Sequence, residues 1–384
     1  MHSSINPETE ARALIDTLPE AVHYVVIGMG FGYHVLELLR KYPECRVTVL
    51  ESEMGFILSA LHYHDWAECF QTNRLELVYE PDIAQLLKRL NNVLGNYELL
   101  VHYPTVQRVE DERIRMLLED FFVTTSSMQE QSHFLDENFQ KIQRRKLPDC
   151  SQLKSLFYKK NVVIVGAGPS VNNEIHALKK YREQLIIFAT GHIARTLLKE
   201  GVVPDAIIIT DPQSHMYQQI KDLNTKEIPL ILLSTASASV LKYYQGPVYV
   251  AYQKGYHPAE LEAEKRSVDM FETGGSVTTT ALDIALRFEA KNIIFVGVDL
   301  AYTGGNSHAE GVGRKIASTD GLRKVVSCNG EEIYTSRNLD IYRKWIERRI
   351  ENVTGTVIYN TGDGARIKGT RKMVWKMLYG NRNS

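Results

Sequence analysis

One short segment in the middle of the chain constrains the fold more than any other. Asn161–Ser170 reads NVVIVGAGPS, an apolar run that ends in a glycine-rich turn. Unbroken apolar runs bounded by glycine are typical of strands buried on both faces of a parallel sheet. Glycine allows close backbone approach, proline suits a first helical turn, and serine can cap a helix. The segment therefore predicts a strand, a tight turn and the start of a helix.

The same turn has the features of an anion site. The N–H groups and the dipole at a helix start attract phosphate and carboxylate groups. We therefore expect Gly166, Gly168, Pro169 and Ser170 to bind the phosphate of a nucleotide. The pattern GxGPS is neither the dinucleotide fingerprint nor a Walker loop. A turn with a purely structural glycine is the alternative interpretation.

Strand and helix patterns alternate along most of the chain, which predicts an α/β fold of two Rossmann-like units. The second is expected to be a mostly parallel sheet with helices on both faces. We predict domains at 1–112 and 158–384, a helical connector at 113–157, and C-terminal helices. Strands are predicted at 22–27, 46–50, 75–79, 98–102, 162–165, 185–189, 206–210, 230–234, 248–251, 292–296 and 356–360. Helices are predicted at 34–42, 171–181, 194–200, 276–288 and 339–353.

The first unit carries a second glycine-rich loop, Gly28–Gly32, after its first predicted strand. Glu51 follows the second strand, as in folds that bind nucleotides or S-adenosylmethionine, where such an acid accepts hydrogen bonds from ribose hydroxyls. The spacing is looser than in those folds. A bound cofactor and a structural relic are both consistent with it.

Composition excludes several function classes. The formal net charge is −1, so no basic field attracts nucleic acid or anionic lipid. The four cysteines show no metal-binding spacing, and scattered thiols favour a reducing cytoplasm. No apolar run reaches the length of a membrane helix, and the first residues lack the pattern of a signal peptide. We therefore expect a cytoplasmic protein without nucleic-acid or membrane partners.

Polar and glycine residues follow several predicted strands of the second unit. Because parallel strands end at one edge of a sheet, these residues are expected to lie together there. Each also has a plain structural explanation, such as a turn or a helix cap. The residues concerned are Thr190, Gly191, Asp211, Gly274, Gly275, Ser276, Asp299 and His308.

Together these motifs resemble the motility accessory factor family, the flagellin glycosyltransferases of bacteria. The resemblance extends from about residue 155 to the C-terminus. It is carried by GAGPS at 166–170, VPDAIIITDPQ at 203–213, ETGGSVTTTALDIAL at 272–286, IIFVGVDLAYTGGNSHAEG at 293–311 and YNTGDGARIKGT at 359–370. The same domain is similar to bacterial sialyltransferases that use CMP-sialic acid. It is also similar to an archaeal-type 6-hydroxymethylpterin diphosphokinase.

The family resemblance implies transfer of a nonulosonic acid, such as pseudaminic or legionaminic acid, from a CMP-activated donor to Ser or Thr of flagellin. By analogy with the sialyltransferases, Thr190, Gly191 and Asp211 would reach ribose or sugar hydroxyls. Those enzymes tend to have asparagine near these positions, so Gly191 and Asp211 are departures from their pattern.

The Gly274–Ser276 turn, at a second helix start, would bind the sugar carboxylate or the phosphate. His308 is the candidate base, with Asp299 as its rival. No DxD pair is evident, so we expect neither a metal nor a cofactor beyond the donor.

Two other functions remain open from the sequence. One is a pterin diphosphokinase that uses ATP and magnesium. The other is a catalytically degenerate module that binds flagellin. The C-terminal helix carries Arg343, Lys344, Arg348 and Arg349, which are predicted to form a solvated face with pairs along the helix.

Overall fold

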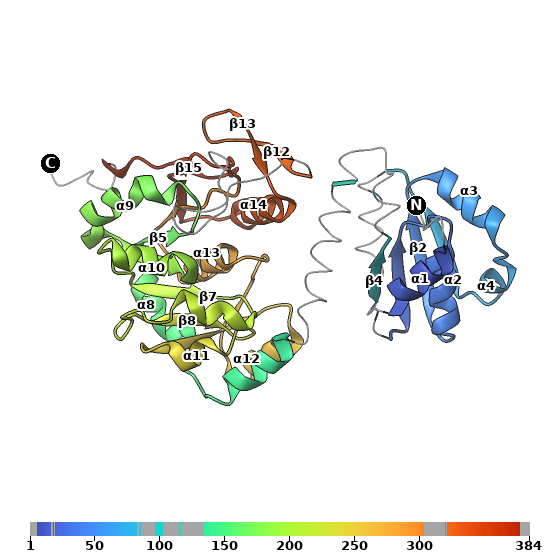
Figure 1. Cartoon of the computed structure of the whole chain (residues 1–384), viewed down its shortest axis with the longest axis horizontal. Coiled ribbons are helices and arrows are strands. Elements are labelled where there is room, and N and C mark those ends of the chain that lie inside the picture. Colours follow the sequence, from blue (N-terminus) through green and yellow to red (C-terminus); the bar gives the residue numbers. More distant parts are fainter. Residues whose placement is uncertain are drawn as a thin grey trace. The chain divides into compact units, whose positions relative to one another are not determined.

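The structure is a computed structural model that describes residues 6–16, 18, 20–82, 85, 97–102, 115–116, 134–302, 319 and 321–376. The chain divides into two compact units, Met1–Ser126 and Ser127–Ser384, and Figure 1 labels many of their elements. Each unit is described by itself.

The first unit contains a four-stranded parallel sheet in the order β3-β2-β1-β4. Its strands are β1 (His23–Ile27), β2 (Arg46–Glu51), β3 (Leu75–Tyr79) and β4 (Glu98–Val101). Its helices are α1 (Pro7–Asp16), α2 (Tyr33–Lys41), α3 (Met54–Tyr63) and α4 (Ala67–Gln71). Helix α2 buries Val35, Leu38 and Leu39, whose spacing places them on one helical face.

The second unit is built on a nine-stranded sheet in the order β10-β9-β8-β7-β6-β5-β11-β14-β15, and every pair of neighbouring strands is parallel. The strands are β5 (Asn161–Val165), β6 (Ile186–Thr190), β7 (Ala206–Ile209), β8 (Leu230–Leu233), β9 (Val248–Gln253), β10 (Met270–Phe271), β11 (Asn292–Val296), β14 (Val357–Asn360) and β15 (Arg371–Lys372).

Helices and one hairpin complete this unit. The helices are α8 (Lys154–Phe157), α9 (Val171–Lys180), α10 (Gly191–Lys199), α11 (Val240–Tyr243), α12 (His257–Arg266), α13 (Val277–Arg287) and α14 (Arg337–Ile350). Short 3-10 turns lie at η1 (Cys150–Leu153), η2 (Arg182–Gln184) and η3 (Ser214–Gln219). The antiparallel hairpin joins β12 (Arg323–Val326) to β13 (Glu332–Thr335).

The apolar run of β5 is unbroken because both faces of the sheet are covered. Val162 and Ile164 belong to one core cluster, which also contains residues of α13. Val163 and Val165 point to the opposite face and belong to a second cluster, with residues of α9 and α10. Alternate side chains of one strand therefore stabilise two separate cores.

The predicted fold class is confirmed: two α/β units are present and the second has a long parallel sheet. The predicted helix at 339–353 is present as α14, and the strand predicted after it is β14; the chain then adds β15 to the sheet. Of the predicted connector, residues 134–143 are helical, and most positions before them lie outside the described residues.

Candidate functional site

The carboxyl ends of β5, β6, β7 and β11 lie along one edge of the large sheet, since these strands are parallel neighbours. Strand order reverses between β5 and β11, because the chain continues from β5 to β6 on one side and returns to the other side with β11. Ligands of open α/β sheets bind at such an edge, near the point of reversal. The structure thus brings the predicted loops to one edge.

The amides of the turn after β5 are largely used inside the protein. Gly166 and Gly168 each donate their N–H, at 2.8 Å, to backbone oxygens of residues 296–297. The Ser170 N–H donates to a side-chain carboxylate at 2.8 Å, and Pro169 has no N–H to give. The N–H groups of Gly166, Gly168 and Ser170 thus have partners inside the protein, and phosphate binding by this turn stays a prediction.

The glycines of this turn are required for close packing between two strand ends. A Cβ atom on Gly166 would lie 2.5 Å from the carbonyl oxygen of Gly297. A Cβ on Gly168 would lie 2.7 Å from that oxygen and 2.7 Å from Oδ2 of Asp299. The backbone at 166–168 thus lies against the backbone at 297–299, as expected for a turn with a structural glycine.

Asp299 occupies the anion position at the start of α9. Its Oδ2 accepts the Ser170 N–H at 2.8 Å, and its Oδ1 accepts the Ser170 hydroxyl. The side chain of Ser170 therefore binds Asp299 and makes no capping bond to α9. Asp299 is 3% exposed, and a Cβ on Gly362 would lie 2.8 Å from its Oδ1. Burial raises the pKa of Asp299, while the bonds from Ser170 oppose that shift.

The first unit repeats this arrangement with Glu51. Its Oε2 accepts the N–H of Met29, inside the loop Gly28–Gly32, at 2.7 Å. Its Oε1 accepts two further backbone N–H groups at 2.8 and 2.9 Å. Glu51 is 2% exposed, and burial raises its pKa against the effect of these bonds. The acid expected to bind ribose is thus bonded to its own glycine loop.

Thr190 and Gly191 lie at the predicted edge but are buried. Thr190 is 2% exposed, and a Cβ on Gly191 would collide with the side chain of Gln219 on η3. Because both residues are buried, the structure gives no support to their predicted contacts with sugar hydroxyls. His192, the next residue, is exposed.

Asp211 and Gly275 both lie near Tyr342 of α14. Asp211 is half-buried, and its Oδ1 accepts the N–H of Gln213 at 2.8 Å. Burial and then the charge of Asp211 raise the pKa of Tyr342. A Cβ on Gly275 would lie 2.9 Å from a ring carbon of the same tyrosine.

Ser276 is a helix cap. Its hydroxyl accepts the N–H of Thr279 at 3.2 Å, and its own N–H donates to the Thr279 hydroxyl at 3.1 Å, which forms a capping box at the start of α13. Ser276 therefore serves as a helix cap, which is the plain structural explanation given for it above. His308, the candidate base, lies outside the described residues.

A cleft of about 820 Å³ opens beside Asp211. Its lining includes Asn172 of α9, His192 and Arg195 of α10, and His215 of η3. Arg195 is fixed by its Nη2, which donates to two backbone oxygens at 2.7 and 3.2 Å. A guanidinium group can bind an anion, and an imidazole can accept a proton near neutral pH. We call this the carboxyl-edge cleft.

Sequence reasoning gave Asp211 a place in the site but assigned no role to the other residues of the cleft. His215 follows Asp211 by four positions, and Arg195 follows His192 by three. Residues three or four positions apart lie on the same side of a helix. Polar residues at this spacing just after a strand end were therefore the sequence signal for this cleft.

Two features are absent from the part of the chain that the structure describes. It contains no cluster of three or more His, Cys, Asp or Glu side chains that could hold a metal ion. Within the same residues, no helix has the length and apolar character to cross a membrane.

Two family models match this chain. Residues 1–100 match the glycosyltransferase Maf N-terminal domain. Residues 132–305 match the family described as 6-hydroxymethylpterin diphosphokinase MptE-like. The resemblance indicated by the sequence motifs is confirmed at this level.

Comparison with solved structures shows the fold. The chain is similar to a Maf glycosyltransferase from Magnetospirillum magneticum, with a TM-score of 0.56 and 18% identity over 98% of this chain. It spans 63% of the length of that protein. A cysteine synthase of a Flavobacterium species is 34% identical over 59 residues, which cover 14% of this chain and 19% of the synthase. A match so short carries no functional inference.

Proposed function

We propose, from the premise that this chain joins a Maf glycosyltransferase N-terminal domain to an MptE-like domain, that it is a glycosyltransferase. The donor would be a CMP-activated nonulosonic acid, and the acceptor a Ser or Thr of flagellin. The reaction would take place in the cytoplasm, before the acceptor is exported. The pairing of the two domains is the observation that carries this proposal.

The carboxyl-edge cleft supports the proposal because its chemistry suits the donor. Such a donor carries a phosphate and a sugar carboxylate, and it must lose CMP as the glycosidic bond breaks. Arg195 would stabilise the departing phosphate, since guanidinium groups bind such anions through paired hydrogen bonds. Asp211 would accept hydrogen bonds from ribose or sugar hydroxyls. The predicted donor contacts thus shift from the sealed turn at Gly166–Ser170 to this neighbouring cleft.

Transfer also needs a group that takes the proton of the acceptor hydroxyl. His192 and His215 line the cleft, and an imidazole nitrogen can take a proton from a hydroxyl. Either would serve as the base while the sugar carbon is attacked. Buried Asp299 would support the loop after β11 and take no proton from the acceptor. No metal is required in this scheme.

The first experiment is a thermal-shift titration with CMP and with ATP, each with and without magnesium. A ligand that binds the native state raises the melting temperature by mass action. We expect CMP to stabilise the protein without metal, and Arg195→Ala to lose that effect. Lys226→Ala, which removes an exposed cation elsewhere in the unit, is the matched control.

A pterin diphosphokinase is the second candidate, favoured by the match of residues 132–305 to the MptE-like family. It would require ATP and magnesium, because phosphoryl transfer depends on the cation. Stabilisation only by ATP with magnesium would support this candidate. No stabilisation by any nucleotide would instead favour a flagellin-binding module without catalysis, consistent with the sealed glycine turn.

A further inference from the structure

A second cleft, of about 620 Å³, lies at the opposite edge of the large sheet. It is formed by the last turns of α14, the first residues of β14 and the segment 368–371. Because Val357 and Ile358 begin β14, the cleft opens at the amino ends of the strands. We call it the amino-edge cleft. Nothing in the proposed glycosyl transfer uses it.

Four cations line the amino-edge cleft: Lys344, Arg348, Lys368 and Arg371. Lys344 is paired with Asp340, at 3.1 Å between Nζ and Oδ2. The other three side chains are exposed and form no ion pair with any residue that the structure describes. They come from two separate segments of the chain, α14 and residues 368–371.

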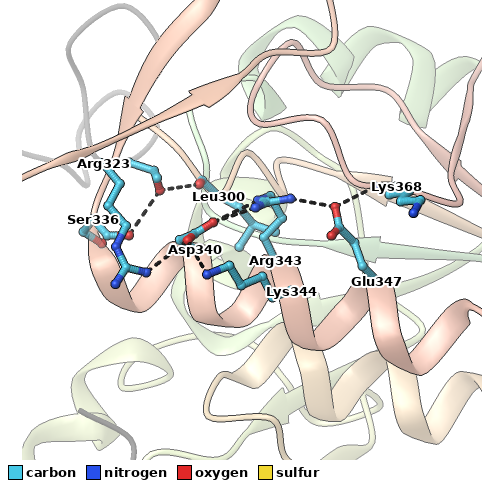
Figure 2. A network of polar contacts seen from close by, with 9 residues as sticks. Leu300, Arg323, Ser336, Asp340, Arg343, Lys344, Glu347 and Lys368 are labelled. Atoms are coloured by element: carbon cyan, nitrogen blue, oxygen red, sulfur yellow. Dashed lines mark hydrogen bonds and ion pairs between the residues drawn. The ribbon is translucent and has the colours of Figure 1, made fainter. Parts of the chain in front are cut away.

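The two acids of the amino-edge cleft do not balance these cations. Glu347 is already used: its Oε1 accepts from Nη1 of Arg343 at 2.7 Å and from the N–H of Lys368 at 2.8 Å (Figure 2). Glu351, at the end of α14, is the remaining acid. Among the described residues, three cations without an ion pair and one such carboxylate, Glu351, therefore line the cleft.

The helix dipole explains only part of this charge. Basic residues in a last helical turn complement the negative end of the helix, which accounts for Arg348. Lys368 and Arg371 lie outside the helix and bring their charges to the same concave surface. Like charges gathered on one concave surface repel one another and give that surface a positive potential. A bound anion would relieve that repulsion.

We propose that the amino-edge cleft binds a small phosphate-type anion with at least two negative charges, in the class of diphosphate. Unpaired guanidinium and ammonium groups are the donors that recognise phosphate oxygens. Among the described residues that line it, none is aromatic, so no ring is available to stack on a nucleotide base. Recognition would therefore be directed at the phosphate groups.

The test is isothermal titration of the full chain with sodium pyrophosphate at constant ionic strength and without magnesium. We expect saturable binding at one site. The double variant Arg348→Ala/Lys368→Ala should weaken it about tenfold or more, because it removes two of the charge-assisted contacts. The matched control, Lys180→Ala/Lys226→Ala, removes two exposed cations elsewhere and should bind like the unmodified protein.

Three results would overturn the proposal. One is the absence of saturable binding to the unmodified protein. Another is equal affinity in the cleft variant and the control. The third is binding that Arg195→Ala abolishes and the cleft variant retains, since the anion would then occupy the carboxyl-edge cleft. Arg371→Glu, on the exposed edge strand β15, provides an independent variant if the double variant melts at a lower temperature.

Discussion

Asp299 and Glu51 each place a carboxylate where a phosphate would otherwise lie. Both accept N–H groups from the glycine-rich turn that follows the first strand of their unit. Both are buried, so neither charge is screened by water. Each turn therefore donates an N–H group to a carboxylate of its own unit.

Removing the hydroxyl of Ser170 tests this arrangement. In Ser170→Ala, Asp299 loses one of two donors, so its pKa should rise further, and the free energy of unfolding should fall by about 1.5–3 kcal/mol. A carboxyl group with a raised pKa binds more protons in the folded state, so its contribution to stability falls as pH rises from 3.8 through the raised value. Urea unfolding from pH 4 to 7 should show a steeper loss in the variant. An identical pH profile would contradict the assignment.

Gly168→Ala tests the close approach of the two strand ends. Its Cβ would lie 2.7 Å from two oxygen atoms, so we expect a loss of about 3 kcal/mol from forced backbone movement. Gly201→Ala is the control, because that position has open space but a φ of +76° and should lose only about 1 kcal/mol. Chemical denaturation of both variants gives the comparison. Equal losses in the free energy of unfolding would contradict this prediction, because they would mean that the atoms around Gly168 move aside at no energetic cost.

At the scale of elements, Asp340 joins α14 to the hairpin. It is 1% exposed and accepts from Arg323 of β12 at 3.0 Å and from Arg343 at 2.7 Å (Figure 2). Burial raises its pKa, but the bond from Arg343 and the charges of Lys344 and Arg343 outweigh burial and lower it overall. The hairpin and the helix are thus held by one buried anion.

Asp340→Asn should therefore destabilise the second unit at neutral pH, by about 3 kcal/mol, because three cations lose their shared partner. A lowered pKa means that the unmodified carboxyl is charged and stabilising above pH 3.8 and loses this effect as pH falls through the lowered value. The difference in stability between variant and unmodified protein should shrink as pH falls from 3.8 through the lowered value. Unfolding at a series of pH values from 7 downward measures it, and a difference that does not shrink as the pH falls would contradict the prediction.

Two adjacent arginines of α14 offer a sharper comparison. Arg349 Nε lies 2.7 Å from Oδ1 of Asp283, which is 0% exposed on α13, whereas Arg348 has no ion pair among the described residues. Arg349→Met should cost about 2 kcal/mol, since a buried carboxylate loses a charged donor, and Arg348→Met should be nearly neutral. Thermal melts of both variants measure this difference in stability. A similar effect of the two substitutions would mean that the bond between α13 and α14 adds little.

The elements that sequence predicted well are those with a strong local pattern. β5 and β11 are apolar throughout, and both were found. β12 and β15 were missed because RKVV and the pair Arg371–Lys372 are short and polar. The solvated face predicted for α14 was wrong for Arg349, whose partner lies 66 residues away in the sequence. The sealed turn was also beyond prediction, since its partner Asp299 lies 129 residues from Ser170.

At the scale of the whole molecule, the two units have separate cores and should unfold separately. We expect two calorimetric transitions. Glu51→Gln should lower the temperature of one, because it weakens the bonds to the loop of the first unit, and Asp340→Asn should lower that of the other. A single transition that moves with both substitutions would contradict this independence.

The central position of β5 has a consequence for the newly synthesised chain. One neighbour, β6, begins at residue 186, but the other, β11, begins only at residue 292. On the ribosome, at about 5–20 residues per second, one edge of β5 therefore waits on the order of ten seconds for its partner. An unpaired apolar strand edge is a template for aggregation. Nascent chains stalled before residue 292 should therefore be the form of this protein that depends most on chaperones.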